Sequence, residues 1–321
     1  MMNFLLRIFG LGLTVVFVFY IAESDTINDY ITYVKAGKVE SVFWQDQGDK
    51  DLRAAIHAGA KKKNRPAIDA RIDPVWKLIP GYNGIQVDEN KTFQKTWRKN
   101  NHKKIEWVYR EIKPKITINH FQQVPIYRGN EQKRSVALMI NVAWGTEFLP
   151  QMLEILEKEH VKATFFLDGS WLSKHQADAK KILQAGHELG NHAYSHPLMS
   201  QISEARMETE IAKTEKLLGQ CCKQRSRWFA PPAGDFNQTV VDVAESHQMK
   251  TVLWTVDTVD WRRSTSVSDM TRKIDEKVSN GSLILTHPTN RTVEAFPKLI
   301  QIIKKKGLKL ERVSDVLSSN R

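Results

Sequence analysis

At 321 residues the chain is long enough for one large domain and a smaller one. Its 41% hydrophobic and 26% charged residues argue against a chain that is disordered along its length. The formal net charge of +12 favours a polyanionic partner: nucleic acid, an anionic membrane surface or an anionic cell-wall polymer.

The N-terminal residues 1–25 predict an export signal. Arg7 precedes an apolar run from Ile8 to Ala22, and the acids Glu23 and Asp25 follow it. The run is shorter than a full span of about 20 residues, which favours a signal peptide over a membrane-spanning helix, with a buried core helix as the alternative. Phe4–Leu6 would lengthen the run if Arg7 snorkels, so an uncleaved anchor stays open. The charge asymmetry places the rest of the chain outside the membrane, where we expect wall polymer and no nucleic acid as a partner.

Residues 26–123 predict a small α+β module of unknown role. Apolar residues recur at helical spacing over 27–34, and a polar helix is expected over 51–63. Asn83-Gly84 is typical of a hairpin turn. The basic clusters Lys61–Lys63 and Lys103-Lys104 are either solvated faces or docking points for an anionic polymer.

Beyond residue 130, strands and helices alternate regularly. Such alternation with short connections predicts a parallel sheet, either a barrel or doubly wound, with its chemistry at the carboxyl ends of the strands. The predicted strands are 135–142, 162–169, 187–193, 226–234, 250–257 and 281–288, and the predicted helices are 148–160, 173–186, 206–219, 239–249, 267–280 and 293–307.

Polar side chains gather at the predicted strand ends. His192 and His196 lie four residues apart, a spacing that lets two imidazoles reach one metal ion. Asp168, Asp260 and His287 follow other strands of the same sheet. Elsewhere, the adjacent cysteines at 221 and 222 cannot form a disulfide framework, and we expect two buried or half-buried thiols.

These strand ends, taken in order, resemble the polysaccharide deacetylase family, the NodB-homology domain of carbohydrate esterase family 4. The resemblance covers about residues 124–321 and rests on "GHELGNHAYSHP" (186–197), "VKATFFLDGSW" (161–171), "DTVDW" (257–261) and "LTHP" (285–288). The wording "MINVAWG" and the upstream module look like the sporulation-associated subgroup of spore-forming Gram-positive bacteria. The resemblance implies a distorted (β/α) barrel that removes N-acetyl groups from peptidoglycan or chitin-like glycan with zinc or a similar divalent metal.

The resemblance also implies roles for particular residues. His192 and His196 match the metal histidines, His287 matches the acid that protonates the leaving amine, and Asp260 matches its carboxylate partner. In addition, three residues match the substrate pocket: Trp261 and Leu285 as apolar residues that shape it, and Ala233 as the donor of a backbone N–H to the oxyanion.

The first motif of the family departs from its usual pattern. Counting back from Gly145, the paired aspartates are replaced by Ala143 and Trp144; counting forward from the strand start, they are replaced by Asn141 and Val142. Neither register supplies the base or the third metal ligand. Asp168 and Glu147 are the nearest carboxylates in sequence that could substitute. The arginine that orients the base is also replaced, by Ala230, which fits a coordinated loss because an arginine without its carboxylate is an unpaired charge.

Two functions therefore compete. One is a metal-dependent deacetylase of weak or altered mechanism, favoured by Asp260, Trp261 and His287. The other is a non-catalytic relative that binds wall glycan, favoured by Ala143, Trp144 and Ala230. A purely structural scaffold would explain the export signal but not the retained histidines.

Overall fold

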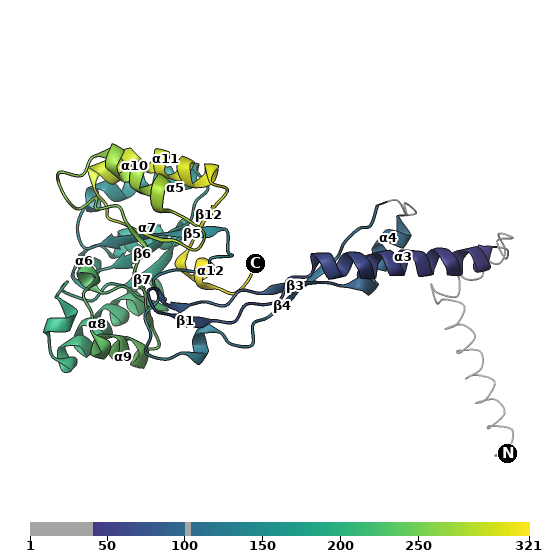
Figure 1. The fold of residues 1–321 in the computed structure, drawn as a ribbon. Coiled ribbons are helices and arrows are strands. Elements are labelled where there is room, and N and C mark those ends of the chain that lie inside the picture. The colour runs from purple at the N-terminus through teal and green to yellow at the C-terminus, as the bar shows by residue number, and fades with distance from the viewer. Residues whose placement is uncertain (1–40, 100–103) are drawn as a thin grey trace, which may run out of the picture. The chain divides into compact units, whose positions relative to one another are not determined.

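The computed structural model describes residues 41–99 and 104–321, and the side chains from residue 48 onward (Figure 1). The predicted leader (1–25), the helical pattern at 27–34 and Lys103 lie outside the described residues. Within the described ranges, none of the helices combines the length and the apolar character that a membrane span requires.

The chain divides into two compact units, which are treated separately. Unit 1 runs to Asn64 and includes Gln86–Arg110, and unit 2 comprises Arg65–Ile85 and Glu111–Arg321. These limits differ from the boundary between residues 123 and 124 suggested by the sequence, because residues 65–85 and 111–123 cluster with the larger unit.

Unit 1 is built around two helices, α3 (Ser41–Lys63) and α4 (Glu89–Arg98). The guanidinium of Arg53 on α3 lies 3.8 Å from the ring centroid of Phe93 on α4. The side chain of Asp88 caps α4 by accepting a hydrogen bond from the backbone N–H of Lys91. The helix predicted over 51–63 is therefore present, and α3 begins ten residues earlier, at Ser41.

The hairpin predicted at Asn83-Gly84 is wrong. The hairpin lies between β1 (Arg71–Asp73) and β2 (Lys77–Ile79), whereas residues 82–85 are extended and pair antiparallel with residues 65–68. A Cβ on Gly84 would lie 2.5 Å from the backbone nitrogen of Ala67. Gly84 is thus required for the close approach of two backbones rather than for a turn.

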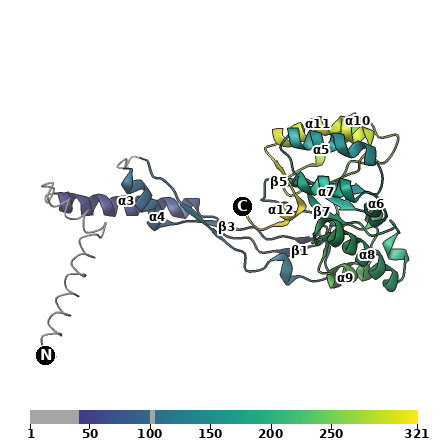
Figure 2. The ribbon, with the colours of Figure 1, turned by 180° about the vertical axis from the view of Figure 1, so that it is seen from behind.

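Unit 2 is dominated by a curled parallel sheet covered by helices, which confirms the predicted distorted (β/α) barrel (Figures 1 and 2). The strand order is β10-β11-β5-β6-β7-β8-β9, and β12 pairs with the first residues of β5. The strands are β5 (Ser135–Val142), β6 (Thr164–Leu167), β7 (Glu188–Asn191), β8 (Trp228–Phe229), β9 (Lys250–Thr251), β10 (Val256–Asp257), β11 (Leu283–Thr286) and β12 (Lys309–Glu311), with β3 (Gly84–Val87) and β4 (Tyr109–Ile112) outside this sheet.

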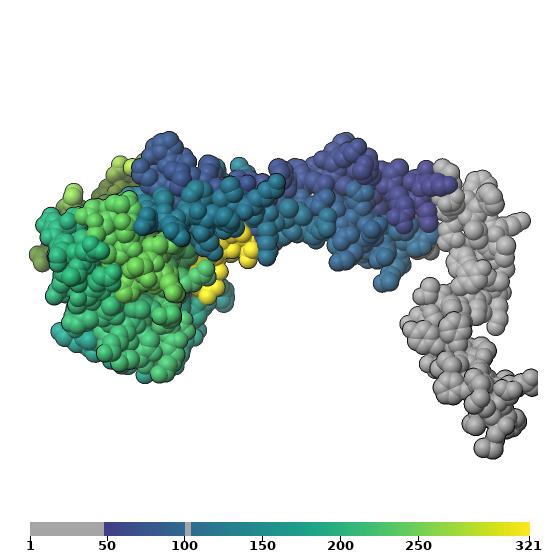
Figure 3. All heavy atoms as spheres, turned by 90° about the horizontal axis from the view of Figure 1, so that it is seen from below, coloured from purple at the N-terminus to yellow at the C-terminus, as the bar shows by residue number. Residues whose placement is uncertain are grey.

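Most helices of unit 2 cover the outer face of this sheet, whereas α12 (Val313–Leu317) packs in the interior cluster with Ala137 and Met139. α5 and α10 both pack against α11, and α8 packs with α6, α7 and α9. The segments that contain α8 and α9 form one continuous stretch of the surface (Figure 3). The helices are α5 (Leu149–Lys158), α6 (Gly169–Lys174), α7 (Gln176–Gln184), α8 (Glu204–Cys222), α9 (Gln238–Ser246), α10 (Val267–Lys277), α11 (Asn290–Lys305) and α12 (Val313–Leu317), with 3-10 turns η2 (Ile118–His120), η3 (Thr146–Phe148), η4 (Met199–Gln201) and η5 (Pro232–Gly234).

β5 shows how the sheet separates two cores. All eight of its residues are buried, and their side chains alternate between two apolar clusters. Val136, Leu138, Ile140 and Val142 pack in the cluster under the outer helices, whereas Ala137 and Met139 join the interior of the barrel. The next interior position on this strand is Asn141, at the carboxyl end.

The single strand predicted over 250–257 is wrong, because this segment contributes two strands at opposite edges of the sheet. β9 pairs with β8, whereas β10 pairs with β11. Between β9 and β10, the backbone N–H of Leu253 donates a hydrogen bond to the carbonyl of Ile126, which lies outside the strands of the sheet. The segment 252–255 therefore crosses the seam of the barrel.

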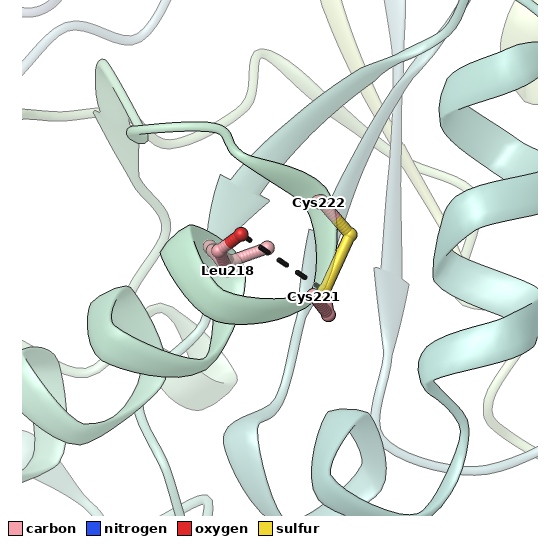
Figure 4. The surroundings of a disulfide bond; sticks show 3 residues. All are labelled: Leu218, Cys221 and Cys222. Carbon is pink, nitrogen blue, oxygen red and sulfur yellow. Dashed lines mark hydrogen bonds between the residues drawn. A yellow bond between two sulfur atoms is a disulfide. The ribbon is translucent and has the colours of Figure 1, made fainter.

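The two thiols predicted at Cys221 and Cys222 are also corrected, because these neighbours are joined by a disulfide bond (Figure 4). They are the last two residues of α8, and the chain leaves the helix at Lys223, whose φ is 54°. No free cysteine remains among the described residues.

Candidate active site

A cavity of about 270 Å³ lies where the barrel strands end, as the sequence predicts. It brings together side chains that are far apart in sequence and come from most strands of the sheet. Its lining consists of Asn141, Trp144, His192, His196, Ala233, Trp254, Asp257, Trp261, Leu285 and His287.

His192 is held rigidly and in one tautomer. Its side chain is 1% exposed, and its Nδ1 lies 2.6 Å from the carbonyl oxygen of Ala230, to which it donates. The other nitrogen, Nε2, is left as an acceptor. Burial, followed by the nearby His196, lowers the pKa of His192 to about 3. The ring is therefore neutral at physiological pH, which is the state that ligates metals.

The loop after β7 that carries both histidines is clamped by the buried carboxylate of Glu210 on α8. This carboxylate accepts hydrogen bonds from the backbone N–H groups of Tyr194 and Ser195, at 2.9 and 2.7 Å. Arg206 pairs with it at 2.6 Å from the exposed side. The clamp holds a backbone in which Ala193 and His196 both have positive φ, of 59° and 55°. Glu210 is a positioning residue that the sequence reasoning missed.

His287 and Asp260 form a buried pair. His287 Nδ1 lies 2.8 Å from Asp260 Oδ1, and the backbone N–H of His287 donates to Oδ2 at 2.6 Å. The hydroxyl of Thr292, in the first turn of α11, donates to the same Oδ2 at 2.6 Å. This carboxylate fixes the imidazole with Nδ1 protonated and Nε2 free on the cavity side. An imidazole held in this way can exchange a proton through Nε2, and the acid role of His287 stays a prediction.

Trp144 occupies the space between the two histidine groups. Its indole stacks on His287 with ring centroids 5.3 Å apart and an angle of 12° between planes, and it meets His196 edge-on at 6.4 Å. Gly145 makes this approach possible: its φ is 74°, and a Cβ there would lie 2.0 Å from the carbonyl oxygen of Pro288. Only glycine allows the end of β5 to lie this close to the His287 segment.

The position of Trp144 resolves the two registers of the first motif. Val142 belongs to the outer cluster and is 0% exposed, so it does not face the cavity. Trp144 lies against His196, so the alignment counted back from Gly145, with Ala143 and Trp144 in place of the aspartates, fits the structure.

The remaining predicted residues differ in their placement. Leu285 is buried, Trp261 is 48% exposed, and both line the cavity. Ala233 also lines it and has a left-handed backbone, with φ of 54°. Glu147 is exposed on η3 and is not among the lining residues.

Asp168 is 1% exposed and serves as the N-cap of α6, accepting from the backbone N–H of Trp171 at 3.0 Å. Burial raises the pKa of this carboxyl. Its Oδ2 is buried and has no hydrogen-bond partner within the described part of the chain.

Two lining residues had no predicted role of their own: Asn141, which entered only through the second register of the first motif, and Trp254. The alternation of β5 could have identified Asn141, because it shares the interior face with Ala137 and Met139. Trp254 could not be found, because its position follows from the crossing of the barrel seam. Asp257 is the last residue of the predicted strand 250–257, and the sequence predicted no role for it.

Comparison with known proteins identifies the family of this chain. The model of the polysaccharide deacetylase family matches residues 128–252. A peptidoglycan-N-acetylglucosamine deacetylase of Bacillus cereus is 32% identical over 200 residues, which are 61% of this chain and 72% of the relative. The chain belongs to the polysaccharide deacetylase family.

Three further similarities cover more of the chain. An uncharacterized protein of Bacillus subtilis, YlxY, is 39% identical over 95% of both chains. The crystal structure of a carbohydrate esterase family 4 pseudoenzyme from Bacillus anthracis superposes with a TM-score of 0.78 and 38% identity, over 84% of this chain and 96% of that one. A variant of that pseudoenzyme, described as having restored enzymatic activity, matches with the same TM-score and 37% identity, over 84% of this chain and 99% of that one.

Polysaccharide deacetylases of this family are generally metal-dependent. The question is therefore whether the side chains at this cavity could bind a divalent metal ion. His192 and His196 fit, since their ring centroids are 5.2 Å apart and His192 offers a free Nε2. The set is nevertheless incomplete: across residues 41–99 and 104–321 no group of three His, Cys, Asp or Glu side chains could hold an ion. Neither Asp168 nor Glu147 completes it, and the indole of Trp144 lies beside His196 instead.

Proposed function

We propose that this chain is a non-catalytic member of the polysaccharide deacetylase family that binds N-acetylated cell-wall glycan. One observation carries the proposal: Trp144 lies between His196 and His287, where the cavity would need a carboxylate for a third metal ligand. The similarity to a family pseudoenzyme supports the absence of turnover. The similarity to a peptidoglycan-N-acetylglucosamine deacetylase supports the choice of glycan.

A second candidate is a weak deacetylase of altered mechanism, and the pair of His287 and Asp260 favours it. This pair is buried, with both oxygens of Asp260 and Nδ1 of His287 hydrogen-bonded, and it is the part of the machinery that would protonate a leaving amine. What the cavity lacks is the family's base, a carboxylate at position 143 or 144. Loss of a general base costs about 10²–10⁴-fold in rate, so any residual activity would be small.

Divalent metal binding, in this proposal, is weak. Two imidazoles at the site can hold zinc or a similar ion, but a structural or catalytic zinc site normally has at least three protein ligands. The metal would therefore occupy the site only at high concentration and would not be required for glycan binding.

The experiment has two arms on the same purified protein. The first measures co-sedimentation with insoluble peptidoglycan, and the second measures acetate release from N-acetylated wall fragments with zinc added. We expect sedimentation with the wall and acetate at the level of the blank. Release that disappears in His287→Ala would support the weak deacetylase instead. Absence from the pellet, with no release, would reject both functions.

We also propose an extracytoplasmic location, supported by the apolar run Ile8–Ala22 and its flanking charges. A part in sporulation rests on the resemblance of "MINVAWG" and of the upstream module. Contact with an anionic wall polymer or membrane surface rests on the net charge of +12. Cell fractionation checks the location: full-length protein confined to the cytosol would contradict export.

A further inference from the structure

The feature that carries a further inference is the exposed indole of Trp144. Large apolar side chains in water are informative when they cluster, because folding normally buries them. Among the described residues, the tryptophans with an exposed side chain are Trp144 at 44% and Trp261 at 48%, and both line the same cavity. Two exposed indoles around one cavity indicate a surface that a ligand covers.

The indole of Trp144 is held in one orientation. Its ring lies nearly parallel to His287, whose own orientation is fixed by Asp260 through Nδ1. Gly145 holds the backbone in place beside Pro288. A preformed aromatic plane of this kind loses little conformational entropy when it receives a ligand. The face of an indole is electron-rich and attracts polarised C–H groups, which line one face of a sugar ring.

Asn141 adds a polar group that lacks a partner. Its side chain is 3% exposed and lines the cavity, and its Oδ1 is buried with no hydrogen-bond partner in the described chain. An unmet buried polar atom is costly unless a ligand satisfies it. An acetamido substituent has one N–H and one C=O, so it can pair with a side-chain amide in either orientation.

The size of the cavity limits what it can hold. Its volume of about 270 Å³ is at the lower end of small-molecule sites, about 300–1,000 Å³. This suits one sugar unit with its substituent rather than several units. Leu285 and Trp254 give it apolar walls, and Asp257 contributes an acceptor for a hydroxyl group.

We propose that Trp144 and Asn141 form a metal-independent binding site for a single N-acetylated amino sugar of the glycan, with the sugar ring stacked on Trp144 and its acetamido group paired with Asn141. This inference rests on the proposed function and names the chemistry by which the glycan is recognised. The residue that takes the place of a metal ligand thus becomes a recognition residue.

The test uses the full chain and tetra-N-acetylchitotetraose, titrated by calorimetry in buffer containing a chelator. Trp144→Ala is expected to weaken binding about tenfold, equivalent to about 1.4 kcal/mol. Trp144→Phe should retain most of the affinity, because it keeps an aromatic face. Trp76→Ala is the matched control: this partly exposed indole belongs to the same unit but does not line the cavity, and its loss should leave binding unchanged.

Asn141 is tested with Asn141→Leu, which keeps the approximate volume and removes the polar atoms, and its fold is checked by thermal unfolding. We expect Asn141→Leu to bind the acetylated tetramer about tenfold more weakly than the wild type does. We also expect the wild type to bind the acetylated tetramer more tightly than the fully deacetylated one. Tighter binding of the deacetylated tetramer would assign the cavity to an ammonium group held by Asp257 and overturn the proposal.

Failure of the inference and failure of the proposed function give different results. If the wild type binds neither the tetramer nor peptidoglycan, the proposed function is wrong. If the wild type binds but Trp144→Ala binds equally well, glycan binding stands and the stacking site is rejected. Binding that disappears with chelator and returns with zinc would also reject it, because the site would then depend on metal.

Discussion

Three substitutions made together, Ala143→Asp, Trp144→Asp and Ala230→Arg, should convert this chain into an active deacetylase. The carboxylate at 144 would replace an indole that now contacts His196, and would supply the missing metal ligand. The carboxylate at 143 would supply the base, and the arginine at 230 would orient it. Since a positioned base contributes about 10²–10⁴-fold, acetate release should rise by at least that factor.

The structure explains why the changes must be made together. Ala230 is 0% exposed and packs in the interior of the barrel. An arginine placed there alone is a buried unpaired charge, which costs about 3–5 kcal/mol of stability. Adding Ala143→Asp should recover a large part of that loss, and a double-mutant cycle in thermal or denaturant unfolding measures the recovery. The carbonyl of Ala230, which accepts from His192, is unaffected in either case.

The assay is acetate release from N-acetylated chito-oligomers with added zinc. The matched control places the aspartates in the other register, as Asn141→Asp with Val142→Asp, together with Ala230→Arg. Val142 is 0% exposed under the outer helices, so this control should be destabilised and inactive. Activity in the control, or a folded and zinc-loaded triple variant that stays inactive, would refute the assignment of Trp144 to the metal-ligand position.

Further predictions concern single residues. Zinc titration should detect weak binding that His192→Ala abolishes, and equal zinc content in both proteins would exclude the site. Burial, followed by the nearby Lys162, lowers the pKa of His187 from 6.5 to about 4, so below about pH 6.5 the unfolded state binds this proton before the native state does. The free energy of unfolding should therefore fall by about 3 kcal/mol in all between about pH 6.5 and pH 4. His187→Asn keeps an acceptor for the N–H of Ala163, and its free energy of unfolding, measured with denaturant, should depend less on pH. The same pH dependence in the variant and the wild type would contradict this. Glu210→Ala should lower the free energy of unfolding by about 3 kcal/mol or more, because it leaves two backbone N–H groups unpaired. Substitution of the exposed Glu204 on the same helix by alanine should change it little. Similar unfolding midpoints for the two variants would show that Glu210 does not hold the loop.

The sequence predicted what depends on local pattern. The order of strands and helices from 135 onward follows from hydrophobic periodicity, and it brought His192, His196 and His287 to one cavity. It could not predict features set by contacts between distant segments. Asn83-Gly84 has the composition of a turn, but the backbone of residues 65–68 lies against it. The apolar run 250–257 has the composition of one strand, but it crosses the seam of the barrel.

The role of Trp144 could not be predicted for the same reason. From the sequence, one can say only that Trp144 stands where the family usually has an aspartate. In the structure it is a stacked and partly exposed indole, because Gly145 and Pro288 bring the end of β5 against His287. The substitution changes the chemistry of the cavity in addition to removing a ligand.

The most direct test of the account is to recover the ligand after binding. Tetra-N-acetylchitotetraose is titrated into the full chain by calorimetry, first with chelator and then with zinc, and after a long incubation the sugar is analysed by mass spectrometry. The account predicts a saturable binding heat in both buffers and a recovered tetramer that has kept all its acetyl groups. A tetramer that has lost acetyl groups in the zinc sample, but keeps them with His287→Ala, would contradict it.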